Sequence, residues 1–282
     1  NATPPVAPVA WQTRVSPRVA AVGAPDDRDE HVARRGTTQP GVPPRLLVFF
    51  PGSAMGPGKL LRVPPSLYDA ALYEGYHVLG VAYRTEVSLR QLCDGQPHGC
   101  AHATRRALLE GPRDDASPRL AGMAAGEAIL PRVIEALEQL VRDDPDGGWD
   151  AFLVPTAPPD DLLAQVRWDR VAVAGYSLGA GQAALIAQTV TVERLLILSG
   201  PCDEEARAPA AWLGGPSATD MTRAAHAMRH PDDASCTTQQ EAWDALGVDA
   251  TRRYLAASCD ARPHAAPALC SDNLDTWRAM LR

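Results

Sequence analysis

The chain has 282 residues, of which 45% are hydrophobic and 22% are charged. This composition is that of a globular protein with a sizeable core, and it excludes a wholly disordered chain and a small disulfide-stabilised fold. The formal net charge of −7 argues against a general nucleic-acid-binding role. No apolar run approaches the roughly 18 residues of a membrane helix, so no transmembrane segment is expected, and no signal peptide is visible in the chain.

Residues 1–44 differ in character from the rest of the chain, because they are rich in Pro, Ala, Val and charged residues. The proline pairs at 4–5 and 43–44 interrupt regular elements there. We therefore expect an irregular N-terminal arm, with one or two edge strands near residues 11–15 and 19–22.

From residue 45 onward, short apolar runs alternate with amphipathic stretches. Apolar strands that alternate with helices predict a mostly parallel sheet with helices on both faces. The expected strands are residues 45–50, 77–83, 171–174, 195–198, 224–228 and 254–258. The expected helices are residues 65–75, 129–141, 179–188, 239–246 and 274–281. Two insertions, near 84–118 and 144–168, are expected to form a Cys-bearing loop and an irregular excursion.

The six cysteines are spaced in a way that favours disulfide bonds over metal binding. Two local pairs each flank a loop, which leaves the remaining two cysteines to pair with each other. The expected bridges are Cys93–Cys100, Cys259–Cys270 and Cys202–Cys236. No C-x-x-C pair or Cys/His spacing typical of zinc is present, so no metal site is expected. Six reduced core cysteines are the alternative, but the even count favours an oxidising compartment and a secreted or periplasmic protein.

The sharpest chemical signal is the segment Gly-Tyr-Ser-Leu-Gly-Ala-Gly at residues 175–181. It matches the pattern G-x-S-x-G directly after a predicted strand and before a predicted helix, which is the context of a nucleophilic serine. Ser177 would lie at a tight turn that tolerates only small neighbours, and the helix N-terminus would face developing negative charge. The small residues after the serine predict close packing of this helix on the sheet.

With this motif and its Ser-x-Gly-Ala-Gly continuation, residues 45–282 resemble the α/β-hydrolase superfamily, in particular secreted bacterial esterases, lipases and polyester hydrolases. A group of exported hydrolases with a Cys pair after the fourth strand is also similar. The resemblance implies one catalytic domain with an eight-stranded, mostly parallel sheet. It places the nucleophile after the fifth strand, an acid after the sixth or seventh, and a histidine after the last. Two positions depart from the common pattern: Tyr176 stands where histidine or tryptophan is frequent, and Pro51-Gly52 replaces a His-Gly pair.

A serine hydroxyl needs a base that takes its proton, and seven histidines are available. Only His226, His230 and His264 follow Ser177, as the order of the superfamily requires. His226 lies inside a predicted strand, and His230 lies at its end, where the acid is expected. His264 lies in a loop between the last predicted strand and the last predicted helix, and we predict that it is the base.

The base in turn needs a carboxylate that holds its tautomer and stabilises its protonated form. Asp232 and Asp233 follow one predicted strand, and Asp203 follows the strand before it. We favour Asp233, with Asp232 and then Asp203 as alternatives. An oxyanion hole would add two backbone N–H groups. The first is that of Leu178, directly after the serine, and the resemblance to polyester hydrolases implies that Ser53 supplies the second.

These residues together predict a serine hydrolase that cleaves small or polymeric carboxylic esters through an acyl-enzyme, without a cofactor. A peptidase or amidase of the same fold shares this chemistry and is one alternative. A hydrolase-fold binding protein without activity is the other, and the intact Ser177 and His264 argue against it.

Overall fold

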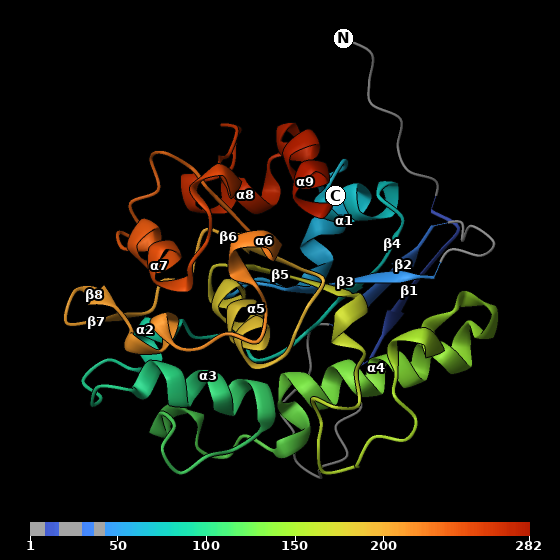
Figure 1. Cartoon of the computed structure of the whole chain (residues 1–282), viewed down its shortest axis with the longest axis horizontal. Helices are drawn as coiled ribbons and strands as arrows, with labels where there is room; N and C mark the ends of the chain where they lie inside the picture. Colours follow the sequence, from blue (N-terminus) through green and yellow to red (C-terminus); the bar gives the residue numbers. More distant parts are fainter. Residues whose placement is uncertain (1–8, 17–29, 37–42) are drawn as a thin grey trace.

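The computed structural model describes residues 9–16, 30–36 and 43–282, and its centre is a sheet of eight strands (Figure 1). The strands are β1 (Trp11–Val15), β2 (His31–Arg35), β3 (Arg45–Phe50), β4 (Tyr76–Gly80), β5 (Val171–Tyr176), β6 (Arg194–Leu198), β9 (Ala225–Arg229) and β10 (Arg253–Leu255). They lie in the order β1-β2-β4-β3-β5-β6-β9-β10. β2 is antiparallel to β1 and β4, and the other neighbouring strands are parallel. This arrangement confirms the expected α/β-hydrolase fold.

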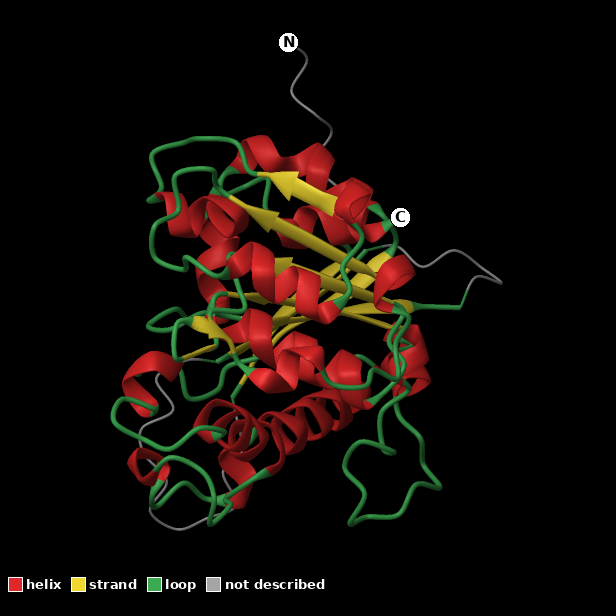
Figure 2. Ribbon diagram, turned by 60° about the vertical axis from the view of Figure 1, so that its left-hand side comes forward, coloured by secondary structure: helices red, strands yellow, loops and turns green. Residues whose placement is uncertain are grey.

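Helices cover both faces of the sheet (Figure 2). The α-helices are α1 (Leu67–Tyr73), α2 (Leu89–Leu92), α3 (Cys100–Glu110), α4 (Ile129–Asp143), α5 (Leu178–Thr189), α6 (Met221–Ala224), α7 (Gln239–Leu246), α8 (Ala266–Leu269) and α9 (Leu274–Leu281). α4 and α5 pack on one face, whereas α1 and α9 pack together on the other. Because successive side chains of a strand point to opposite faces, Leu46 and Val48 of β3 join the first core and Leu47 joins the second. Each expected element after residue 45 is present, with ends shifted by a few residues.

The segment expected to be an irregular arm contributes two strands to this sheet. β1 lies at the expected position and pairs with β2, which in turn pairs with β4. β2 is therefore an internal strand, and Val32 and Ala33 are fully buried. This strand was not predicted from the sequence, because its last two residues are arginines, which are rare inside a sheet. Each arginine has an acidic partner: Arg34 pairs with Asp69 and Arg35 with Asp144. The strand expected at 19–22 lies outside the described residues.

The two insertions differ from each other. Residues 84–118, expected to form a loop, contain the eleven-residue helix α3, which begins at Cys100 and packs against α4 and α5. The loop was predicted from the two closely spaced cysteines. The Ala- and Arg-rich residues after Cys100 instead favour a helix. Residues 144–168 form turns and short 3₁₀ helices, including Pro145–Gly147 and Trp149–Phe152. After β6, the chain forms a small hairpin of β7 (Glu204–Glu205) and β8 (Ala208–Pro209). In the described ranges, every helix is too short or too polar to cross a membrane.

Candidate active site

Ser177 lies at a sharp turn between the end of β5 and the start of α5. Its backbone has φ of 54° and ψ of −112°, a conformation that costs free energy in a residue with a side chain. A Cβ atom at Gly175 would lie 2.0 Å from the carbonyl oxygen of Gly179. One at Gly179 would lie 2.0 Å from the carbonyl oxygen of Phe50. The two glycines of the motif are therefore required by close approach of the backbone, as in a nucleophile elbow.

The loop after β3 lies directly against this turn. A Cβ atom at Gly52 would come within 3.0 Å of the Cβ of Ser177 and within 2.7 Å of the Tyr176 ring. Glycine in the Pro51-Gly52 pair thus lets the loop and the turn meet. The sequence departs from the His-Gly pair of many lipases at this point, but it keeps the glycine that the contact needs.

Of the backbone N–H groups beside Ser177 that have no acceptor within the described part of the chain, two lie at the residues expected to form an oxyanion hole. One belongs to Leu178, the first residue of α5, and the other to Ser53, which follows Gly52. The next N–H, of Ala54, is occupied because it donates to the carbonyl oxygen of Thr85 at 2.6 Å. Ser53 and Leu178 therefore each keep a donor available at the residues where the oxyanion hole is expected.

His264 lies in a short 3₁₀ helix, Pro263–Ala265, between β10 and α8. Its Nε2 lies 2.8 Å from Oγ of Ser177, and its Nδ1 lies 2.8 Å from Oδ2 of Asp233. The histidine side chain is 20% exposed, whereas the Asp233 side chain is fully buried. The ring of Tyr176 packs beside the imidazole, with the ring centroids 5.4 Å apart. The structure thus brings serine, histidine and aspartate into one hydrogen-bonded chain.

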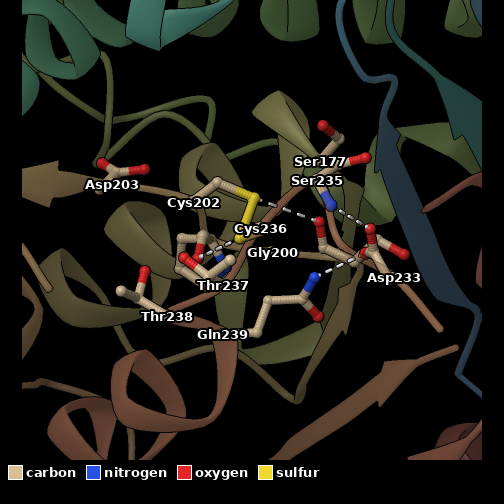
Figure 3. The surroundings of a disulfide bond; sticks show 12 residues. Ser177, Gly200, Cys202, Asp203, Asp233, Ser235, Cys236, Thr237, Thr238 and Gln239 are labelled. Carbon is tan, nitrogen blue, oxygen red and sulfur yellow. Dashed lines mark hydrogen bonds between the residues drawn. A yellow bond between two sulfur atoms is a disulfide. The ribbon is translucent and has the colours of Figure 1, made fainter. Parts of the chain in front are cut away.

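Asp233 follows β9, the seventh strand of the main sheet in chain order, and it is held by three groups, of which Figure 3 shows Ser235 and Gln239. Besides the His264 contact, its Oδ1 accepts from the backbone N–H of Ser235 at 2.9 Å and its Oδ2 from Nε2 of Gln239 at 2.7 Å. Burial alone would raise the pKa of this carboxyl group, but the contacts with His264 and these two donors hold the pKa below its ordinary value. Asp233 therefore stays ionised at neutral pH. Gln239 was not predicted as a site residue, because its position at the start of a predicted helix is its only sequence signal.

The other two carboxylates considered from the sequence do not contact His264 within residues 43–282. The Asp232 side chain is 83% exposed. Asp203 is fully buried, and both of its oxygens accept from the guanidinium group of Arg105. Of the three carboxylates, only Asp233 is in contact with the imidazole.

The two other histidines after Ser177 also have contacts of their own. Nδ1 of His226 lies 3.2 Å from the hydroxyl oxygen of Tyr254, and its Nε2 lies 2.8 Å from the guanidinium of Arg252. Nδ1 of His230 accepts from the backbone N–H of Asp232, so its Nε2 carries the proton and donates to Oγ of Ser258 at 2.8 Å. His230 therefore links the loop of Asp233 to the segment before His264, a role that no sequence pattern indicated.

All three expected disulfide bonds are present in the structure, and two of them border the site. Cys259–Cys270 closes the loop that carries His264. Cys202–Cys236 joins the loop after β6 to the loop that carries Asp233 (Figure 3). Cys93–Cys100 lies at the N-terminus of α3. Among the described residues, no group of three or more His, Cys, Asp or Glu side chains could hold a metal ion.

Comparison with known proteins finds likeness only among solved structures. No protein-family model matches the chain, and no curated protein matches it. A proposed dienelactone hydrolase from Klebsiella pneumoniae subsp. pneumoniae MGH 78578 is 14% identical, with 96% of each chain covered and a TM-score of 0.44. The protein TT1662 from Thermus thermophilus is 15% identical, with 97% of this chain and 98% of that chain covered and a TM-score of 0.46.

Proposed function

We propose that the protein is a serine hydrolase that cleaves carboxylic esters through an acyl-enzyme intermediate. The observation that carries this proposal is the hydrogen-bonded chain from Ser177 Oγ through His264 to Asp233, with 2.8 Å at each step. A serine hydroxyl, an imidazole and a buried carboxylate in this order are the groups that acyl transfer requires.

The contacts support a role for each side chain in this reaction. Because ionised Asp233 accepts from Nδ1 of His264, the free lone pair of the imidazole is on Nε2 and faces the Ser177 hydroxyl. His264 accepts the serine proton as Oγ attacks the ester carbonyl, and Asp233 stabilises the imidazolium that forms. The same proton then passes to the leaving alkoxide. A water molecule activated by His264 hydrolyses the acyl-enzyme in the second half of the reaction.

The negative charge that develops on the carbonyl oxygen needs donors that are already in place. We assign this role to the backbone N–H groups of Leu178 and Ser53, which have no acceptor in the described part of the chain. Leu178 also begins α5, so the partial positive charge at this helix N-terminus lies on the same side.

We also propose that the protein works in an oxidising compartment, outside the cell or in the periplasm. Its support is the three disulfide bonds, two of which border the candidate site. Such bonds are rare in proteins of a reducing cytosol, where they would open and release the loops of His264 and Asp233.

Turnover of matched substrates tests the proposed reaction. A series of p-nitrophenyl esters of increasing acyl length is compared with the p-nitroanilides of the same acids, for the wild type and for Ser177→Ala. We expect ester hydrolysis by the wild type and a loss of roughly 10⁶-fold in kcat in the variant. Faster cleavage of the anilides would instead indicate a peptidase or amidase. Equal ester hydrolysis by both proteins would overturn the proposal.

A further inference from the structure

A buried ion pair lies behind the nucleophile turn, outside the chain of Ser177, His264 and Asp233. Arg105 of α3 and Asp203, which follows β6, have side chains that are 1% and 0% exposed. Nε and Nη2 of Arg105 donate to the two oxygens of Asp203. The third contact of the guanidinium is different, because Nη1 donates to the carbonyl oxygen of Leu178 at 2.9 Å. A hydrogen bond thus links the ion pair to the first residue of α5.

Gly181 explains how the guanidinium reaches this position. A Cβ atom at residue 181 would lie 2.0 Å from Cζ of Arg105 and 2.1 Å from Nη2. The last glycine of the Gly-Ala-Gly continuation therefore leaves space for Arg105 rather than for the sheet, which corrects the sequence expectation for this residue. A side chain at position 181 could not coexist with Arg105 as it lies here.

The N-terminal residue of α5 does not cap the helix with its side chain. In many helices, the side chain of the N-cap serine accepts from a backbone N–H of the first turn. Here the N-cap is Ser177, which makes no such bond because its hydroxyl is directed to His264. Arg105 contacts the same turn through the carbonyl oxygen of Leu178, so it leaves the N–H groups of the turn free.

Asp203 and the helix that carries Arg105 are each held in place by further contacts. Oδ2 of Asp203 also accepts from Nε1 of Trp212 at 3.0 Å. The N-terminus of α3 is held by the Cys93–Cys100 bridge and by the N–H of Gly99, which donates to Oε1 of Glu205 at 2.8 Å. A well-packed apolar pair is often as stable as a buried ion pair, so stability alone is a weak reason for placing two charges here.

We propose that Arg105 is a positioning residue for the oxyanion hole: by bonding the Leu178 carbonyl oxygen, it fixes the residue whose N–H we assign to that hole. This inference rests on the proposed ester hydrolysis at Ser177. It predicts that loss of the Arg105 contact slows the chemical step and leaves substrate binding almost unchanged, because the oxyanion exists only in the transition state and the intermediates near it.

The test uses the double variant Arg105→Met/Asp203→Asn, which removes both charges and keeps an acceptor for Trp212. We expect kcat to fall about 10-fold or more, KM to stay within about twofold, and affinity for a boronic acid that forms a tetrahedral adduct with Ser177 to fall in parallel with kcat. Arg106→Met is the matched control, since Arg106 is the next residue of α3 but lies near the surface and pairs with Glu110. It should leave all three values unchanged.

A second variant keeps the inference testable if the double variant does not fold. Arg105→Lys keeps a positive charge beside Asp203 but replaces the planar fork that contacts both Asp203 and Leu178. It should show the same selective loss in kcat. Wild-type kcat and boronic acid affinity in a folded protein with either change would overturn the inference. An inactive wild type, or an active Ser177→Ala variant assayed alongside, would instead overturn the proposed function.

Discussion

The loops after β6 and β9 each carry a buried aspartate, yet the two carboxylates have different partners. Figure 3 shows Asp203 and Asp233 on opposite sides of the Cys202–Cys236 disulfide that joins the loops. Asp203 accepts from Arg105, whose guanidinium also donates to the Leu178 carbonyl oxygen, whereas Asp233 accepts from His264. Asp203 and Asp233 are both buried, and each lies a few residues after a strand of the sheet. The difference between them is therefore the cationic or imidazole partner that each carboxylate contacts.

Asp233→Asn is expected to have the largest effect among changes to these two loops. An amide at this position cannot stabilise the imidazolium and allows the wrong tautomer, so kcat on a p-nitrophenyl ester should fall by about 10⁴. Circular dichroism checks that the variant is folded. Asp232→Asn is the matched control, because its exposed carboxylate should be dispensable. Retention of more than about a tenth of the activity by Asp233→Asn would show that Asp233 is not the acid, given the loss expected for a triad acid.

Asp203→Asn should act mainly on stability, in contrast to Asp233→Asn. Removal of one charge leaves the guanidinium of Arg105 buried without a counter-charge, which we expect to lower the free energy of unfolding by about 3–5 kcal/mol. Urea denaturation measures this change. Activity per folded molecule should fall much less than in Asp233→Asn, because Arg105 can still bond the Leu178 carbonyl. A folded, stable Asp203→Asn with the activity loss of Asp233→Asn would reverse the two assignments.

The Cys259–Cys270 bridge should affect activity and stability together, to a smaller degree. It closes the loop of His264 over 11 residues, and a closure of this length contributes about 3 kcal/mol by the chain-entropy account. In Cys259→Ala/Cys270→Ala, we expect a several-fold lower kcat at temperatures where the core is still folded, because His264 is less well placed. Unchanged kcat under these conditions would show that Asp233 and Ser177 position the imidazole without the bridge.

His226 should affect only the pH dependence of stability. Burial, together with the charges of Arg252 and Arg194, lowers the pKa of His226 to about 4. Its unfolded value is about 6.5, so protonation favours the unfolded chain. Its contribution to stability is complete above pH 6.5 and is lost as the pH falls toward 4. In His226→Gln, the urea concentration at the midpoint of unfolding should therefore change less with pH between about 4 and 6.5 than in the wild type. The kcat at pH 8 should be unchanged. A dependence on pH equal to that of the wild type would contradict the assignment.

Much of this arrangement could be predicted from the sequence because it depends on chain order and local sterics. The G-x-S-x-G pattern marks the strand-to-helix turn, and the glycines are explained by backbone contacts at that turn. Cysteine spacing indicated the three bridges, since each local pair closes a short loop. His264 was favoured because it alone lies in a loop after the last predicted strand.

The contact of one particular aspartate with His264 and the burial of Arg105 could not be predicted in the same way. Asp232 and Asp233 are adjacent, and only the turn of the chain after His230 decides which one is buried. Arg105 belongs to an Arg-Arg doublet that resembles any exposed charge pair. Its burial depends on Gly181 and Asp203, which are about 75 and 100 residues away in the chain. Strand β2 was not predicted for a related reason, because its arginines pair with aspartates that are distant in the sequence.

Covalent labelling tests whether His264 activates the hydroxyl of Ser177 for nucleophilic attack. The wild type, Ser177→Ala and Asp203→Asn are treated with a fluorophosphonate, and tryptic peptides are analysed by mass spectrometry. We expect one phosphonate per molecule on Ser177 in the wild type and in Asp203→Asn, and none in Ser177→Ala, because only a hydroxyl activated by His264 reacts rapidly. No label on Ser177 in the folded wild type, or an equal amount of label in Ser177→Ala, would contradict it.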